Sequence, residues 1–175
     1  MSRLAGVIGS RSLPASFSPL VSRVVSLLLS RGYSIASGGA VGADSFALSA
    51  LLLQGAASRG IIHSAWVSAS GFPSSVQPQV SSFLASGGQV VWGSASPSQP
   101  RSLVVPALLG RNRRLVSASS VVVAFLHGSS RGSLYTVRQA ITQGVSVIVF
   151  LCGGGASLPA DLASSCLVFT EKEVF

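Results

Sequence analysis

Charge is scarce in this sequence, and acidic residues are the scarcest of all. Only 9% of the 175 residues are charged, and four of them are Asp or Glu. Three of the four acids lie close to the C-terminus: Asp161, Glu171 and Glu173. General acid–base catalysis by paired carboxylates needs two such groups in one site. The distribution therefore argues against an enzyme of that kind and leaves Asp44 as the acidic candidate for a catalytic role.

Cysteines and long apolar runs are also few. Cys152 and Cys166 do not have the spacing of a metal site, so we predict no bound metal and reduced thiols. The mean hydropathy is high, at +0.62. However, the longest apolar run, Val145 to Cys152, is far shorter than the roughly 20 residues that cross a bilayer. We expect a cytoplasmic protein without membrane contact or signal peptide.

Arginine, by contrast, is abundant. Eleven Arg and one Lys against four acids give a formal net charge of +8. Planar guanidinium groups suit bidentate contacts with phosphate, so the surplus predicts an anionic partner, either nucleic acid or a nucleotide. A general arginine bias of the genome, together with a need for solubility, is the alternative explanation.

One long segment contains no charge. No Asp, Glu, Lys or Arg occurs between Arg59 and Arg101. A Ser-rich, uncharged surface of this length is suited to contact with another copy of the chain. We therefore expect a homodimer or higher oligomer, with its interface between Gly60 and Pro100.

The chain is organised around a glycine-rich stretch that runs from Ser37 to Asp44, with the sequence SGGAVGAD. It lies between a short apolar run and an apolar periodic segment, which predicts a strand, a glycine turn and a helix. Glycine lets a ligand approach the backbone, and the N-terminus of a helix attracts anions, most often phosphate. Asp44, in the first turn, is suited to accept hydrogen bonds from a sugar hydroxyl or a base. A turn that only connects two elements has the same pattern.

Strand-like and helix-like segments alternate along the whole chain. This alternation predicts an α/β fold with a three-layer, doubly wound, mostly parallel Rossmann-like sheet of six or seven strands. We expect one domain over residues 1–175, with a Ser/Pro loop from Ser94 to Pro106. The expected helices cover residues 20–31, 46–53, 76–84, 108–116 and 134–143. The expected strands are Leu4–Ile8, Tyr33–Ala36, Ile61–Val67, Gln89–Trp92, Val121–Leu126 and Val145–Phe150.

Three turns directly follow expected strands and carry glycine, serine or arginine. They are Gly9-Ser10-Arg11, Ser37-Gly38-Gly39 and the segment from Gly128 to Ser133. Ligands of doubly wound sheets bind beyond the carboxyl ends of the strands, at the switch point. We therefore expect all three turns on one rim of the sheet.

Two further features point to the same rim. The hydroxyls of Ser133 and Thr136, at a second helix start, can donate to a phosphate, although an ordinary N-cap needs the same residue types. The run Arg111-Asn112-Arg113-Arg114 lies on an expected helix, where Arg111 and Arg114 share a face and Arg113 points elsewhere. A solvated basic helix face is the alternative reading of this run. Of the two histidines, His127 ends a strand and is a candidate ligand contact, whereas His63 is expected in the core or on the surface.

Taken in order, these motifs resemble the Rossmann-like domain of the DprA/Smf DNA-processing proteins, within the SMF/LOG (SLOG) superfamily. The resemblance covers roughly Leu4 to Phe150. It implies that the chain binds single-stranded DNA or a nucleotide through a basic pocket, forms dimers and assists a recombinase. The segments that carry it are Gly9–Arg11, Ser37–Asp44, Gly110–Arg113 and Gly132–Thr136, followed by Ala140 and Gly144.

The LOG branch of the same superfamily offers an enzymatic alternative. The LOG branch resembles phosphoribohydrolases that act on nucleoside monophosphates, so likeness to it implies such an enzyme. A sensor of a nucleotide-derived signal is a related alternative. Its hallmark is a Pro-Gly-Gly-x-Gly-Thr turn followed by a catalytic glutamate. This chain has Ser130 to Thr136 there and no glutamate, so we favour binding over catalysis, with Asp44 as the catalytic candidate in the other case.

The sequence and the resemblance together predict one phosphate- or nucleotide-binding site. No cofactor is predicted apart from a bound nucleotide. The predicted residues are Gly9, Ser10, Arg11, Ser37, Gly38, Gly39, Gly42, Asp44, Arg111, Asn112, Arg113, Gly128, Gly132, Ser133 and Thr136.

Overall fold

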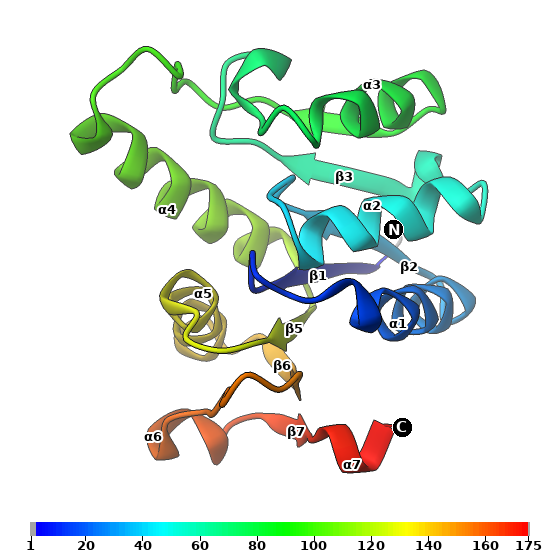
Figure 1. Ribbon diagram of the computed structural model, residues 1–175, viewed down its shortest axis with the longest axis vertical. Coiled ribbons are helices and arrows are strands. Elements are labelled where there is room, and N and C mark those ends of the chain that lie inside the picture. Colours follow the sequence, from blue (N-terminus) through cyan, green and yellow to red (C-terminus); the bar gives the residue numbers. More distant parts are fainter. Residues whose placement is uncertain (1–2, 175) are drawn as a thin grey trace.

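The structure, a computed structural model, describes residues 3–174. Seven parallel strands form a single sheet in the order β4-β3-β2-β1-β5-β6-β7. The chain builds outward from β1 to β4, returns through α4, and then builds outward on the other side from β5 to β7 (Figure 1). The strands are β1 (Arg3–Gly9), β2 (Tyr33–Ser37), β3 (Gly60–His63), β4 (Gln89–Val91), β5 (Val121–Leu126), β6 (Ser146–Leu151) and β7 (Leu167–Phe169).

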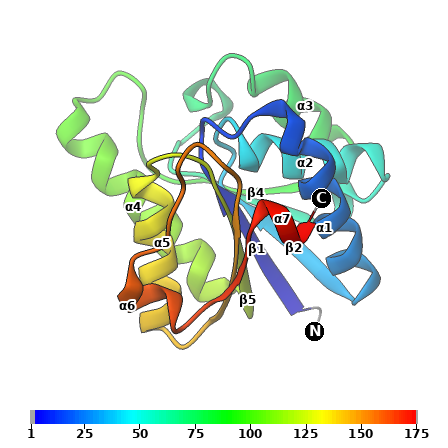
Figure 2. The ribbon, with the colours of Figure 1, turned by 60° about the horizontal axis from the view of Figure 1, so that its bottom comes forward.

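Helices cover both faces of the sheet, as Figure 2 shows. The helices α1 (Ser18–Ser30), α2 (Ala43–Leu53) and α3 (Gln77–Ala85) pack side by side on one face. The other face carries α4 (Arg101–Ala118), α5 (Arg131–Thr142) and the short α6 (Ala160–Ala163). A last short helix, α7 (Glu171–Val174), follows β7. The predicted three-layer, doubly wound fold is confirmed.

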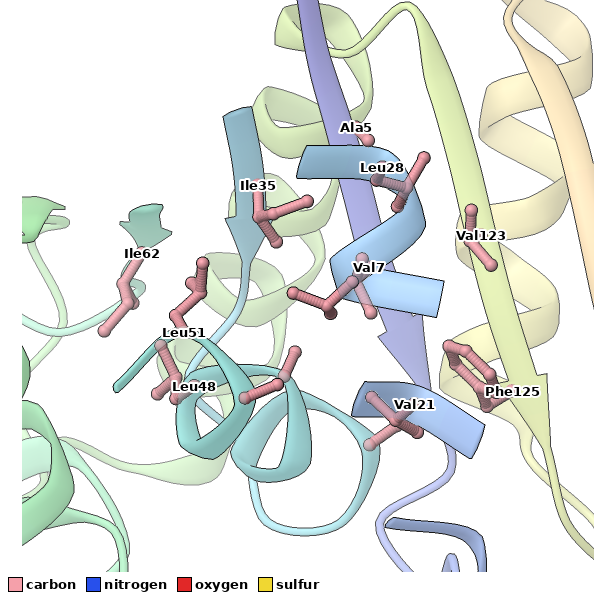
Figure 3. Close-up of a cluster of buried hydrophobic side chains, with 14 of the residues drawn as sticks. Ala5, Val7, Val21, Leu28, Ile35, Leu48, Leu51, Ile62, Val123 and Phe125 are labelled. Carbon is pink, nitrogen blue, oxygen red and sulfur yellow. The ribbon is translucent and has the colours of Figure 1, made fainter. Parts of the chain in front are cut away.

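The apolar core lies in two layers because the central strands are buried on both faces. All six residues of β5 are buried. Its alternate residues Val123 and Phe125 pack toward α1 and α2, within the cluster shown in Figure 3. Val122 and Ala124 pack toward α4 and α5 on the opposite face. A continuous β-branched run therefore fills both layers, as expected for a central parallel strand.

Two boundaries differ most from the sequence prediction. The expected Ser/Pro loop to Pro106 is wrong beyond Pro100, because α4 already begins at Arg101 and continues through Pro106. A proline removes one backbone donor but does not always end a helix. The strand predicted to reach Val67 ends at His63, where the hydroxyl of Ser64 accepts the N–H of Trp66 at 2.9 Å and turns the chain.

The doubly wound order sets where a ligand site can form. The strands β1 and β5 are neighbours, yet their connections leave in opposite directions, so a gap opens beyond their carboxyl ends. Within residues 3–174, no helix has the length and apolar character needed to cross a membrane.

Candidate phosphate-binding site

A cavity of about 360 Å³ lies at this switch point. Ten of the fifteen predicted residues line it, from the end of β1, from the turns that follow β1 and β2, and from the helices α2, α4 and α5. We call it the phosphate cavity. Apart from Ile8 and Leu115, its lining consists of Gly9, Ser10, Arg11, Ser12, Gly38, Ala40, Asp44, Arg111, Asn112, Ser129, Ser130, Arg131, Gly132, Ser133 and Thr136.

The N-terminus of α2, at the glycine-rich stretch, is closed by the protein itself. The Asp44 carboxylate is buried and accepts the N–H of Ala40 at 3.1 Å. The N–H of Ala43 donates to the Ser10 carbonyl at 3.3 Å. Gly42 precedes the helix with φ of 78°, and a Cβ there would collide with the Ser10 and Arg11 carbonyls. The first donor of this helix, the Ala43 N–H, is therefore used within the fold, and a carboxylate of the protein itself occupies the turn before it.

Arg111 completes this closure from α4. Its guanidinium is buried and donates from Nη1 to the carbonyl of Gly38, whose missing side chain leaves room for it. The same Nη1 lies 4.0 Å from Oδ2 of Asp44. Among the described residues, Nε of Arg111 has no hydrogen-bond partner. The arginine therefore balances a buried carboxylate, while its buried Nε–H is left without a partner.

Burial shifts the titration of both partners. It raises the pKa of Asp44 above the usual 3.8, while the Arg111 charge and the Ala40 N–H oppose the shift. It lowers the pKa of Arg111, and the Asp44 charge opposes that shift. Arginine begins from so high a pKa that it stays charged at neutral pH. The pair thus adds little net positive charge to the cavity as long as Asp44 is ionised.

The N-terminus of α5 is different, because it is open toward the cavity. No side chain caps it at Ser130, whose hydroxyl donates instead to Oγ of Ser133 at 2.8 Å. The Thr136 hydroxyl donates to the Gly132 carbonyl within the helix at 3.0 Å, so in this structure it has no proton to offer a ligand. The first residues of α5, Arg131 to Ser133, line the cavity, and a helix N-terminus beside a cavity is the usual arrangement of an anion site.

Two exposed arginines flank this open helix end. Arg11, after β1, and Arg131, the first residue of α5, both line the cavity. Neither guanidinium forms a hydrogen bond or ion pair with another described residue. With Arg111 held by Asp44, these two side chains carry the positive charge that an anion in the cavity would meet.

Five predicted residues do not line the phosphate cavity. Arg113 is exposed on α4, and Arg114 donates to the Ser64 carbonyl at 2.8 Å, so the expected division of this helix into two faces is seen. Ser37 is buried, with no partner for its hydroxyl among the described residues. Gly42, the residue before α2, packs against the Ser10 and Arg11 carbonyls. Gly39 and Gly128 border two neighbouring cavities instead.

The predicted set omitted several lining residues. Ser129, Ser130 and Arg131 lie in the segment from Gly128 to Ser133 that the sequence predicts on the rim, and Ser12 follows Arg11 directly. Their place between a strand end and a helix start was visible in the sequence. Ala40 takes part through its backbone N–H, which donates to Asp44, and the identity of a residue does not show which backbone groups lie at a site.

The histidines and cysteines take structural positions. His127 is held by two contacts. Its backbone N–H donates to Oγ of Ser10, and its ring Nδ1 lies 2.7 Å from the Cys152 carbonyl oxygen. His63 is buried, and both its ring nitrogens lack partners within residues 3–174, so burial lowers its pKa. Burial also raises the pKa of Cys152 to about 12, which makes the thiol unreactive at neutral pH.

A family model described as DNA recombination-mediator protein A matches residues 1–168. The chain belongs to this family. The predicted resemblance to DprA/Smf proteins is therefore confirmed, and the match covers nearly the whole sequence. Among curated proteins, none matches the chain.

Solved structures show the same fold. DNA processing protein A of Helicobacter pylori, described in its single-stranded DNA binding mode, superposes with a TM-score of 0.71 at 19% identity, over 97% of this chain and 75% of that one. DprA of Streptococcus pneumoniae has a TM-score of 0.70 at 22% identity, over 99% of this chain and 60% of that protein. A molybdenum cofactor binding protein of Rippkaea orientalis has a TM-score of 0.65 at 17% identity, over 96% of this chain and 89% of that one. The DprA-family fold is thus shared with proteins that bind other ligands.

Proposed function

We propose that this DprA-family chain binds single-stranded DNA by its phosphates in the phosphate cavity. The observation that carries the proposal is the open N-terminus of α5, which lies between Arg11 and Arg131. Backbone N–H groups and guanidinium groups contact any phosphodiester in the same way, so sequence preference should be slight. The H. pylori protein with the same fold is described as binding single-stranded DNA, which supports the same ligand here.

The charge of the cavity favours binding over hydrolysis. Asp44 is its only carboxylate among the described lining residues, and it is buried beside Arg111. A general base must reach the proton it abstracts, and this carboxylate instead accepts the N–H of Ala40. The phosphoribohydrolase alternative is therefore not favoured. A free nucleotide remains a competitor for the same cavity.

Fluorescence anisotropy of a labelled oligothymidylate, titrated at several salt concentrations, tests the proposal. We expect log K to fall by roughly 0.7 per phosphate contact for each log unit of salt. Arg11→Ala and Arg131→Ala should each weaken binding and flatten this slope. Arg23→Ala, which removes an exposed arginine on α1, is the matched control and should leave both unchanged.

Two outcomes would contradict the proposal. One is the absence of oligonucleotide binding at low salt, and the other is binding that salt does not weaken. Incubation with AMP provides a separate check, because release of adenine that is lost in Asp44→Asn would establish the enzymatic alternative. AMP added to the anisotropy assay should displace the oligonucleotide without being cleaved.

We also propose that the chain forms homo-oligomers through the β4 edge of the sheet. Residues 1–175 are proposed to be one domain, and the protein is proposed to act in the cytoplasm. Val67, Val91 and Trp92 are 56%, 43% and 40% exposed there, within the segment that has no charged residue. Two copies of net charge +8 repel each other least across an uncharged surface. Light scattering should show a dimer or larger species, and Val91→Lys should reduce it to a monomer.

A recombinase remains the predicted protein partner, in keeping with the description of the family as recombination mediators. The chain spans 60% of the S. pneumoniae relative, so an activity of that whole protein is only a proposal here. Co-purification of this chain with a recombinase from the same cell, in the presence of single-stranded DNA, is the direct test.

A further inference from the structure

A second cavity of about 310 Å³ adjoins the phosphate cavity. The two share four lining residues, so they lie against each other across a common wall. Beyond this wall, the second cavity is lined mainly by carbon, with contributions from Val41, Trp66, Pro73 and Leu108. We call it the Trp66 pocket. The shared residues are Arg11, Gly38, Ala40 and Arg111.

The fold holds Trp66 in a fixed position. Its backbone N–H donates to the Ser64 hydroxyl at 2.9 Å, and its backbone pairs with Ala95 beyond the end of β3. Gly71 packs directly on the indole, since a Cβ at that position would collide with the ring. The side chain is nevertheless only half-buried. It therefore offers a preset aromatic wall to a ligand at little entropic cost.

The two cavities differ in chemistry in the same way as the phosphate and the base of a nucleotide. One presents serines, exposed arginines and a helix N-terminus, and the other presents an aromatic ring and aliphatic side chains. Phosphate suits the first, whereas a flat heterocycle suits the second. Within the pocket the charged groups are Arg11 and Arg111, both in the shared wall.

We propose that the Trp66 pocket receives the base of a nucleotide whose phosphate lies at the N-terminus of α5. This inference rests on the proposed function and adds a base-binding subsite to it. The ligand class is then an unpaired nucleotide, because a base in a duplex is stacked and paired and cannot enter the pocket. Stacking accepts every base, so the pocket selects single strands without reading their sequence.

The test compares two oligonucleotides of equal length, one of thymidine nucleotides and one of abasic sites with the same phosphodiester backbone. The thymidine strand should bind the unmodified protein about tenfold more tightly, which is the usual contribution of one stacked base. Trp66→Ala should remove that difference and leave binding of the abasic strand unchanged. Trp92→Ala, at the other tryptophan, which does not line the pocket, is the matched control and should keep the difference.

Tryptophan fluorescence gives an independent readout. In Trp92→Phe, Trp66 is the sole tryptophan, and the thymidine strand should quench it while the abasic strand does not. If Trp66→Ala does not fold, Leu108→Phe narrows the pocket from α4 and leaves Trp66 and its contacts in place. Leu108→Phe should then reduce the preference for the thymidine strand.

The outcomes separate this inference from the proposed function. Equal, salt-dependent binding of both strands, unchanged by Trp66→Ala and without quenching, would overturn the base subsite and leave phosphate binding intact. Failure of the unmodified protein to bind either strand would overturn the proposed function itself.

Discussion

The helices α2 and α5 both begin at the phosphate cavity after a glycine-bearing turn, yet we expect an anion from outside at α5 and not at α2. At α2, the second helical residue is Asp44, and its carboxylate accepts a backbone N–H. At α5, the second helical residue is Gly132, where an added side chain would meet nothing within 4 Å. The two helices have dipoles of the same direction relative to the cavity. At α2 a carboxylate of the chain itself meets the positive end of the dipole, whereas at α5 we expect a ligand to do so.

The difference shows how a chain with two similar anion-binding signals can produce one site. Asp44 acts as a built-in anion, and Arg111 from α4 locks it in place. The closed end fixes the backbone that carries Arg11, because Gly42 packs on the Ser10 and Arg11 carbonyls. The open end then supplies the contacts. Single substitutions and a change of pH can open the closed helix end or close the open one.

The largest effect is expected when the closed end loses its arginine. Arg111→Met leaves the buried Asp44 carboxylate without its cation, which should cost about 3–5 kcal/mol of unfolding free energy. Urea denaturation monitored by circular dichroism measures this change. Adding Asp44→Asn in the same chain should restore part of the loss. The neighbouring Arg113→Met is the control, and an equal loss there would refute the assigned pairing.

Closing the open end should nearly abolish binding. Gly132→Asp places a carboxylate at the position in α5 that Asp44 occupies in α2. The acid stabilises the helix but repels phosphate, so the affinity for oligothymidylate should fall by about a hundredfold, or about 3 kcal/mol. Gly132→Asn has nearly the same shape without the charge and should bind almost normally. Anisotropy titration of both variants decides whether α5 is the phosphate site.

Opening the closed end should strengthen binding. Asp44→Asn keeps an acceptor for the Ala40 N–H but frees the Arg111 charge to act on a bound anion. We expect affinity to rise by up to about tenfold at low salt, with a steeper salt dependence. Unchanged or weaker binding in a folded variant would show that Asp44 does not neutralise the cavity.

The smallest expected effect is a dependence of binding on pH. Because burial raises the pKa of Asp44 above 3.8, its carboxylate takes up a proton at a higher pH than an exposed aspartate does. Protonation removes a negative charge from the cavity, so binding should tighten as the pH falls through that raised pKa. Arg111 stays charged throughout this range, because arginine begins from a very high pKa. The profile should flatten in Asp44→Asn, and a profile that is the same in both proteins would count against this assignment.

Much of this molecule follows from local sequence. The alternation of apolar runs with glycine turns predicts a parallel doubly wound sheet, and the run from Val121 to Leu126 predicts its central strand. The order of motifs predicts the DprA family. The carboxyl ends of parallel strands must share one edge, so convergence of Arg11, Gly38 and Ser133 on one cavity could also be expected.

Only the tertiary structure decided which of these residues are available to a ligand. Arg111 and Gly38 lie 73 residues apart in the chain, and no local pattern tells that this guanidinium turns inward to a carbonyl beside Asp44. Nor does the sequence tell that Trp66 lines a pocket across the wall formed by Arg11. Periodicity and turn chemistry act between near neighbours and so can be read from the sequence. The pairing of a buried charge depends on which distant helix packs against it, and that is determined only when the chain is folded.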